Sequence, residues 1–157
     1  MKIYLLLNKP VGYSTSHTQN PSIFDLLPQP QDELAPANRL DDNSEGVVLM
    51  TNDVDFFQAK KLENEFEITI DDYLSKPAIK ILSTGMVRNG EIIRGVELIG
   101  EKHKGNRSVV TVIARETNDT EIRKMFEAIG YHVVGIRCTR FDKFKLGVLP
   151  IGKWKKI

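Results

Sequence analysis

The residues of this chain that are best suited to chemistry lie in one polar stretch between residues 38 and 53. Asp41 follows a cation, Arg39, by two positions, and a polar turn that ends at Gly46 separates it from an apolar run at 47–50. This pattern predicts a carboxylate on a constrained loop at the rim of a sheet, beside a fixed positive charge. A carboxylate held in this way stays ionised and can act as a nucleophile or as a base.

Two other interpretations fit part of the same stretch. The residues from Asp41 to Gly46 match the opening of a calcium-binding loop, but the ninth and twelfth positions are Leu49 and Asn52, which cannot complete the oxygen ligands. An ordinary hairpin turn between two strands would also explain the polar residues and the glycine. That turn would not require Arg39, so the stretch favours a catalytic carboxylate.

Composition sets broad limits on the class of protein. With 157 residues and 41% hydrophobic content, the chain is expected to form one domain over residues 1–157, or two small lobes that share a sheet and a core. No apolar run is long enough to span a bilayer, and no basic and then apolar leader opens the chain. A cytoplasmic protein without membrane association is therefore expected.

The cysteine and histidine content argues against a metal centre. The single cysteine, Cys138, excludes an internal disulfide and a cysteine cluster. The three histidines, His17, His103 and His132, are far apart and lack the spacing of metal ligands. We therefore predict no metal site.

Charge is divided unevenly along the chain although the net value is only +1. From residue 121 onward nine basic side chains face three acidic ones, a balance of +6, whereas residues 1–60 carry −4. A basic end suits phosphate groups, although a lysine-rich tail can also be simply solvated. The small total charge predicts weak non-specific binding to nucleic acid.

Apolar spacing predicts alternating strands and helices. Period-two alternation or short apolar runs indicate strands at 3–7, 34–40, 46–51, 66–70, 96–99, 108–114 and 131–141. Short helices are expected at 22–27, 55–62 and 77–83, and the polar residues 101–107 are predicted to form a loop.

The clearest predicted element is a helix at 119–129. Four apolar residues share one face through helical spacing, namely Ile122, Met125, Phe126 and Ile129. Asn118 or Asp119 can cap its start, and Gly130 suits its end. Arg123 and Lys124 lie off this apolar face.

Two motifs together resemble a known enzyme family. The segment Asn8-Lys9-Pro10-Val11-Gly12 and the Asp41 stretch resemble the pseudouridine synthases of the RsuA/RluB/RluE type, which act on ribosomal RNA. Their signatures are N-K-P-x-G and G-R-L-D-x-x-T-x-G-L-L-L-x-T-N-D. A looser third motif, R-Q-V-R-R-M-F followed by G-x-x-V, is similar to residues 120–126 with Gly130 and Val133. The resemblance spans essentially the whole chain, but not the small S4-type RNA-binding domain with which many relatives begin.

This resemblance implies a fold and a reaction. The fold is α+β, with a mixed, largely antiparallel sheet and a few helices around a central catalytic cleft. The reaction is isomerisation of uridine to pseudouridine in RNA, most simply ribosomal RNA, by a monomer that needs no cofactor. The motif aspartate maps to Asp41, and Arg39 and Arg123 are expected to hold it ionised, with a solvated surface cation as the alternative for Arg123. The expected RNA-binding residues are Lys9, Lys124, Arg137, Arg140, Lys153, Lys155 and Lys156.

Two departures from the family pattern bear on activity. Phe66 replaces a tyrosine that stacks on the base; it can stack on the extruded uracil through its ring but lacks the hydroxyl. The alternative for Phe66 is a core residue of an alternating strand. Asn38 replaces the glycine before the arginine, and asparagine also tolerates an unusual backbone conformation.

Two rival functions stay open at this stage. One is a non-catalytic RNA-binding relative of these enzymes, which the Phe66 substitution and the missing S4-type domain leave open. The other is an unrelated nucleotide-binding protein. Against the latter, Gly100 and Gly105 have phosphate-loop spacing but are followed by Asn106 and Arg107 instead of lysine and a hydroxyl residue.

Overall fold

The computed structural model describes residues 1–28, 33–53, 55 and 62–157, which form two compact units. Unit 1 comprises Met1–Leu62 and Cys138–Ile157, and unit 2 comprises Glu63–Arg137. The boundary falls inside strand β9 (Val133–Phe141), between Arg137 and Cys138. Among the described residues, no helix is long and apolar enough to cross a membrane. The single-domain organisation stays a prediction.

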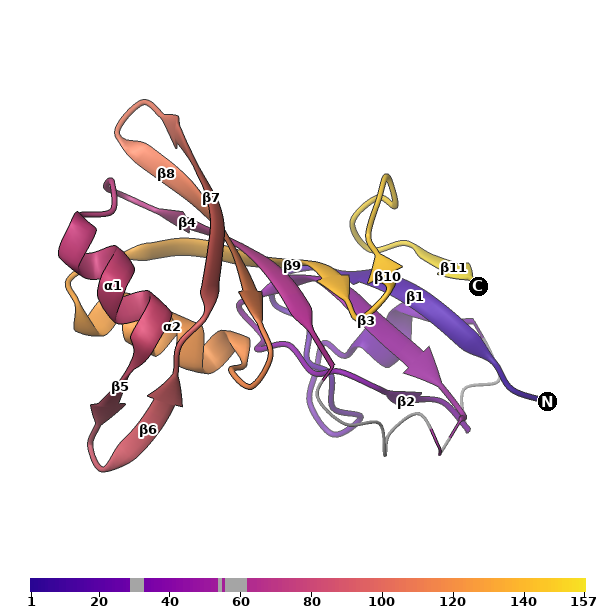
Figure 1. Cartoon of the computed structure of the whole chain (residues 1–157). Helices are drawn as coiled ribbons and strands as arrows, with labels where there is room; N and C mark the ends of the chain where they lie inside the picture. Colours follow the sequence, from indigo (N-terminus) through magenta and orange to yellow (C-terminus); the bar gives the residue numbers. More distant parts are fainter. Residues whose placement is uncertain (29–32, 54, 56–61) are drawn as a thin grey trace. The chain divides into compact units, whose positions relative to one another are not determined.

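Unit 1 is built around one part of the nine-stranded main sheet that the described residues form. Its strand order is β11 (Trp154–Lys156), β1 (Tyr4–Lys9), β3 (Glu45–Thr51) and the C-terminal part of β9 (Figure 1). Strand β1 runs antiparallel to both β11 and β3. Two short strands extend the sheet, β2 (Ala35–Pro36) on β3 and β10 (Phe144–Lys145) on β9.

The core of unit 1 lies around β3, which is buried along nearly its whole length. Its apolar run Gly-Val-Val-Leu-Met is inaccessible on both faces, as expected for a central strand. A 3-10 helix, η1 (Ile23–Leu26), adds Ile23 and Phe24 to the core. Ser22 and Asp25 form a capping box at the start of this helix. The Ser22 hydroxyl accepts from the Phe24 N–H, and the Asp25 carboxylate accepts from the Ser22 N–H.

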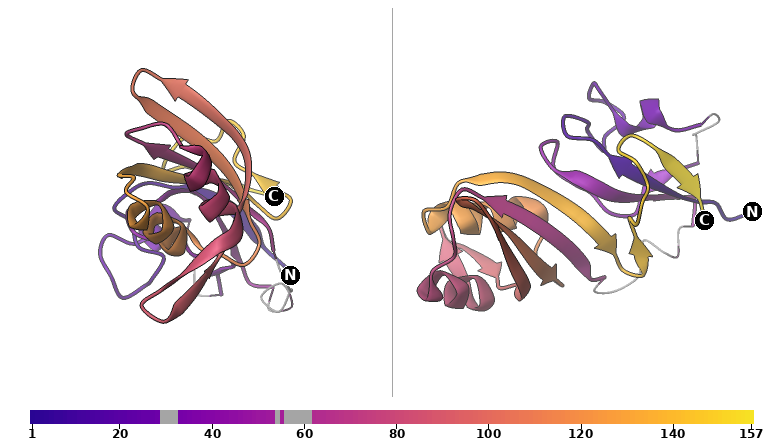
Figure 2. Two further views of the ribbon diagram at one scale, coloured as in Figure 1. Left: turned by 60° about the vertical axis from the view of Figure 1, so that its left-hand side comes forward. Right: turned by 90° about the horizontal axis from the view of Figure 1, so that it is seen from above.

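Unit 2 contains the other part of the main sheet, with helices on one face. Its strand order is the N-terminal part of β9, then β4 (Asn64–Ile70), β8 (Arg107–Ala114) and β7 (Glu97–Lys104). The pairs β4–β8 and β7–β8 are antiparallel. Helices α1 (Lys76–Thr84) and α2 (Asp119–Ala128) cover the same face of this sheet (Figure 2). A separate hairpin, β5 (Gly85–Arg88) with β6 (Glu91–Arg94), follows α1.

The sequence explains these elements of unit 2 locally. In β4, Phe66, Ile68 and Ile70 alternate with half-exposed residues and point into the core. Helix α2 begins at a reciprocal cap between Asn118 and Glu121. It buries three apolar residues of the predicted face, namely Ile122, Met125 and Phe126.

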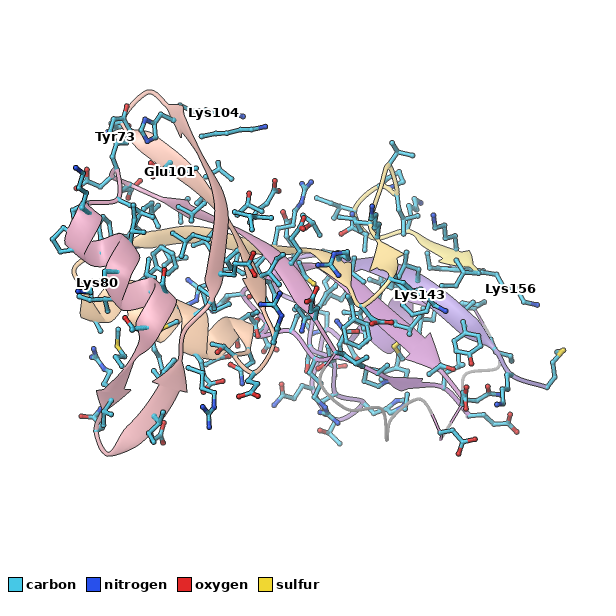
Figure 3. All side chains as sticks on the ribbon, in the orientation of Figure 1. Tyr73, Lys80, Glu101, Lys104, Lys143 and Lys156 are labelled. Atoms are coloured by element: carbon cyan, nitrogen blue, oxygen red, sulfur yellow. The ribbon has the colours of Figure 1, made fainter. Side chains whose placement is uncertain are left out.

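A polar cluster fixes the end of the β7–β8 hairpin. The rings of Tyr73 and His103 stack in parallel with centroids 3.8 Å apart, and the Tyr73 hydroxyl donates to the Gly105 carbonyl (Figure 3). One oxygen of Glu101 accepts from the Leu74 N–H at 3.1 Å and from the Ser108 hydroxyl at 2.9 Å. Burial would raise the pKa of Glu101, but these hydrogen bonds and His103 lower it. The polar residues 101–107 therefore belong to the β7–β8 hairpin, and the loop predicted there is wrong.

Most other predicted elements agree with the structure. The α+β class and the largely antiparallel pairing are confirmed. The strand expected at 34–40 is reduced to Ala35–Pro36, and the β5–β6 hairpin was not predicted. The helix expected at 55–62 lies almost wholly outside the described residues.

Candidate active site

The loop that carries Asp41 is anchored by Lys9, the last residue of β1. The Lys9 side chain is completely buried, and its Nζ donates to the carbonyls of Ser44 at 2.6 Å, Pro10 at 2.9 Å and Asp42 at 3.3 Å. The Gly12 N–H donates to the same Asp42 carbonyl at 2.7 Å. The two N-terminal sequence motifs are therefore joined in space. The burial of Lys9 contradicts its expected direct contact with RNA, because the ammonium is not accessible to a phosphate.

The loop is also fixed on both sides of Asp41. Before it, the Asn38 side chain donates to the Val47 carbonyl at 2.8 Å and accepts from the Leu49 N–H at 2.9 Å. After it, the Ser44 N–H donates to the Asp41 carbonyl at 3.0 Å, which closes a turn. Asp41 itself is half-buried. Its carboxylate thus lies on a short loop whose two ends are both hydrogen-bonded to the sheet.

Asn38 has a different role from the one that the sequence suggested. It is not among the described residues with a positive φ angle. Its side-chain amide instead pairs with the backbone of β3 as a neighbouring strand would. The substitution of the family's glycine is therefore accommodated by hydrogen bonding and not by an unusual backbone.

Gly46 begins the buried part of β3 at a position that excludes any side chain. Its φ is +119°, and a Cβ built there would lie 2.1 Å from the Cys138 carbonyl oxygen. The neighbouring strand β9 therefore packs directly on the Gly46 backbone. This close approach explains the glycine of the motif in terms of packing.

The two arginines of unit 1 have different surroundings. Arg39 is exposed, and no ion pair of its guanidinium with a described residue is seen. Arg140 is half-buried, and its Nη1 donates to the Asp142 carbonyl at 2.7 Å. Support of Asp41 by Arg39 and RNA binding by Arg140 stay predictions.

Asn8 ties β1 to the C-terminal segment. Its side chain donates to the Leu149 carbonyl at 2.8 Å, its N–H donates to Lys153 at 2.9 Å, and its carbonyl accepts from Gly152 at 2.8 Å. This places the exposed C-terminal lysines, Lys153, Lys155 and Lys156, along the edge of the unit 1 sheet; Figure 3 labels Lys156. Lysine on an edge strand also blocks unwanted strand pairing, so a structural role explains these residues as well.

The tail that follows β3 anchors the start of β1. The Asn52 side chain accepts from the Ile3 N–H at 2.7 Å, and the Thr51 hydroxyl donates to the Ile3 carbonyl at 2.7 Å. The Tyr4 hydroxyl donates to the Asp53 carboxylate. That hydrogen bond lowers the pKa of Asp53, with help from Lys2, and raises the pKa of Tyr4. The Thr51-Asn52-Asp53 tail is therefore structural.

The structure also excludes the calcium interpretation of the Asp41 stretch. A calcium loop would need residues 41–52 as an open loop, but residues 45–51 form strand β3. Among the described residues, no group of three or more carboxylate, histidine or cysteine side chains could hold a metal ion.

Unit 2 carries the remaining predicted site residues. Phe66 is only 2% exposed, which fits the core alternative, and its stacking role stays a prediction. Arg123 is half-buried on α2, and its Nε is buried without a hydrogen-bond partner. Lys124 is exposed, and Arg137 lies 3.6 Å from Glu67.

Comparison with known proteins decides the family. The family model for RNA pseudouridylate synthase matches residues 3–128, which include the Lys9 turn, the Asp41 loop and helix α2. The chain belongs to the RNA pseudouridylate synthase family.

Curated relatives of this family are similar along the whole chain. The dual-specificity RNA pseudouridine synthase RluF of Escherichia coli is 25% identical over 162 residues, which cover 99% of this chain and 54% of RluF. The chloroplast protein SVR1 of Arabidopsis thaliana, named as a candidate ribosomal large subunit pseudouridine synthase, is 27% identical over 174 residues, or 97% of this chain and 42% of SVR1. The chain thus spans about half the length of these relatives.

A solved pseudouridylate synthase has the same fold. It superimposes on the whole chain with a TM-score of 0.85 at 24% identity, and this chain covers 70% of it. The pseudouridine synthase motifs of this chain therefore occur on the architecture of that enzyme class.

The anchoring role of Lys9 was not predicted from the sequence. Lys9 was expected to be one of the RNA-binding cations. The sequence does carry a signal: Lys9 ends a strand that is buried along most of its length and follows the leucines at 5–7 after only Asn8. Asn8 and Ser44 were missed because their hydrogen bonds join distant segments.

Proposed function

We propose that this chain converts a uridine of RNA, with ribosomal RNA as the substrate class, into pseudouridine, and that Asp41 is its catalytic carboxylate. The reaction breaks the bond between the ribose C1′ and N1 of uracil and forms a bond between C1′ and C5. The C5 proton is lost and N1 gains a proton, so the product is an isomer of the substrate. No redox step or external group is required.

The fixed Asp41 loop is the observation that carries this proposal. Catalysis by a carboxylate requires that its oxygen be held within a narrow range of positions near C1′. Here Lys9, Asn38 and Gly12 hold the loop from the sheet side, and the Asp41 side chain is left half-buried at its surface. Asp41 acts either as a nucleophile on the sugar or by assisting its rearrangement.

The remaining predicted residues complete the proposal. Arg39 and Arg123 favour the ionised form of Asp41 through their positive charges. RNA is bound by exposed or half-buried cations, namely Lys124, Arg137, Arg140, Lys153, Lys155 and Lys156. The target base must leave the RNA stack to reach the carboxylate, and Phe66 is the candidate platform for it. A cytoplasmic monomer belongs to the same proposal.

Asp41→Asn tests the reaction directly. The amide keeps the shape of the side chain and removes the anionic oxygen, so turnover should be abolished while RNA affinity stays the same. Release of tritium from RNA labelled at uridine C5 measures the reaction, and chemical mapping of pseudouridine in ribosomal and transfer RNA locates the product.

Asp42→Asn is the matched control. It removes a neighbouring, exposed carboxylate and leaves unchanged the backbone carbonyl that Lys9 and Gly12 contact. Full activity of this control beside an inactive Asp41→Asn is expected. Turnover by Asp41→Asn would remove Asp41 from its role, and an inactive wild-type protein that binds RNA would favour the non-catalytic relative, which Phe66 in place of tyrosine also suggests.

A further inference from the structure

The β5–β6 hairpin of unit 2 has apolar side chains on both of its faces. Met86 pairs with Ile93, which is only 2% exposed, so this face packs on the body of the unit. Val87 pairs with Ile92 on the opposite face, and these side chains are 72% and 69% exposed. Exposed apolar side chains that lie together in this way indicate a binding surface.

The base of the hairpin is rigidly attached. A Cβ on Gly95 would lie 2.1 Å from the Ser83 carbonyl oxygen, so only glycine permits the close packing against the end of α1. The Val96 N–H donates to the Leu82 carbonyl at 2.9 Å, and the Thr117 hydroxyl donates to the Arg94 carbonyl at 2.8 Å. The exposed pair is therefore presented in a fixed direction and does not belong to a loose loop.

A cationic pocket lies beside the turn of the hairpin. Its volume is about 320 Å³, and its lining residues come from the hairpin and from α2: Arg88, Asn89, Glu91, Ile93 and Lys124. Asn89 and Gly90 both have positive φ angles, 51° and 81°, which gives the tight two-residue turn that brings Arg88 and Glu91 together. Two cations and an amide against one carboxylate give the pocket a net positive charge suited to a phosphate.

We propose that the β5–β6 hairpin is an RNA-contact element of this enzyme, in which Arg88 and Lys124 bind a backbone phosphate on one face and the Val87–Ile92 pair packs against a nucleotide on the opposite face. Apolar side chains contact ribose and base faces, and cations neutralise backbone phosphates, so both faces of the hairpin suit RNA. This combination favours a nucleic acid over a purely apolar protein surface. The inference rests on the proposed function for the identity of the ligand, which is the RNA substrate.

Removal of the two cations tests the phosphate contact. The probe is a fluorescently labelled stem-loop RNA with uridines in its loop, titrated over a series of salt concentrations. Arg88→Gln combined with Lys124→Gln should raise Kd about tenfold and flatten the salt dependence by about one or two units of slope. The matched control, Lys102→Gln with Lys104→Gln, removes the same charge from β7, and Lys104 lies at the opposite end of unit 2 (Figure 3). Equal weakening by both double variants would overturn the proposal.

Removal of the apolar pair tests the second contact. Val87→Ser with Ile92→Ser should raise Kd about fivefold without changing the salt slope, because it loses apolar burial but no charge. Both side chains are exposed, so the fold should be retained. A wild-type dimer that this variant converts to monomer at unchanged RNA affinity would overturn the proposal in favour of a contact between two copies. Tritium release from wild-type protein is measured in parallel. If the double variants change Kd and salt slope as expected but wild-type protein releases no tritium, the hairpin contact is supported and the proposed reaction is refuted.

Discussion

The Nζ of Lys9 lies 2.6 Å from the carbonyl oxygen of Ser44, so a residue of β1 holds the loop that presents Asp41. The ammonium is completely buried and also donates to the carbonyls of Pro10 and Asp42. Hydrogen bonds from a charged donor are stronger than neutral ones, and burial strengthens them further. These hydrogen bonds therefore join the N-K-P-x-G segment to the loop that carries Asp41.

Lys9→Met should damage catalysis more than RNA binding. The variant keeps the aliphatic stem but leaves three carbonyls without this donor, so the free energy of unfolding should fall by about 1–3 kcal/mol. Turnover in the folded protein should fall at least about tenfold because the Asp41 loop is less well fixed. Urea denaturation and tritium release measure the two effects.

The salt dependence of RNA binding separates this role from a phosphate contact. Lys9→Met should leave the slope unchanged, whereas replacement of Lys153, Lys155 and Lys156 by glutamine should flatten it. A flatter slope for Lys9→Met at normal turnover would restore Lys9 as an RNA contact.

Gly46→Ala should destabilise the protein far more than Gly12→Ala. Both glycines have positive φ angles, +119° and +91°, so each substitution carries a backbone cost of about 1–2 kcal/mol. At Gly12 the new methyl group meets open space, but at Gly46 it meets the Cys138 backbone. Gly46→Ala should therefore lose more than about 4 kcal/mol or fail to fold. Equal losses in urea denaturation would show that β9 moves easily away from β3.

The hydrogen bond between Tyr4 and Asp53 should make stability depend on pH at both extremes. Because the pKa of Asp53 is lowered, its contribution is present above the ordinary aspartate pKa and is lost as pH falls through the lowered value. Because the pKa of Tyr4 is raised, its contribution is present below the ordinary tyrosine pKa and is lost as pH rises through the raised value. The difference in Tm between wild type and Tyr4→Phe should therefore be constant from about pH 5 to pH 9 and shrink outside that range.

A double variant provides the control for this pH effect. In an Asp53→Asn background, Tyr4→Phe should no longer change the pH dependence, because the coupled carboxylate is absent. A wild-type advantage that is as large at pH 2.5 as at pH 7 would contradict the assignment.

The sequence predicted those parts of the fold that depend on local signals. Helix α2 was predicted from its apolar spacing and its Asn118 cap, and β4 from strict alternation, because both patterns are set within a few residues. The β5–β6 hairpin was missed although Asn89-Gly90 between two apolar pairs is a strong hairpin signal.

The candidate site was less predictable because its contacts join distant residues. Asp41 and its motif are recognisable from spacing, but the burial of Lys9 depends on contacts with residues more than thirty positions away. In the same way, Asn38 pairs with β3 through its side chain, which no local propensity would indicate. Charge along the chain was misleading as well: unit 1 contains both residues 1–62, with five basic and eight acidic side chains, and residues 138–157, with six basic and one acidic, so much of the charge cancels within it.

The buried position of Phe66 in β4 makes a core role the alternative to the proposed base stacking. Phe66 is 2% exposed and shares its face with Ile68 and Ile70, both fully buried. Phe66→Ala should then lower the free energy of unfolding by about 3–5 kcal/mol through loss of burial and a residual cavity. Phe66→Leu, which keeps much of the volume, should cost less than about 1.5 kcal/mol.

Turnover of the Phe66→Leu protein distinguishes the core role from stacking on the extruded uracil. Leucine fills the core but offers no aromatic face, so under the core role turnover and Kd in the folded protein should match wild type. Loss of a base–aromatic stack would instead cost about 1–3 kcal/mol in substrate engagement, or about 5- to 150-fold. Phe66→Tyr completes the set: a buried hydroxyl without a partner should lower Tm. If it instead raises turnover and Phe66→Leu abolishes it, Phe66 faces the substrate when RNA is bound.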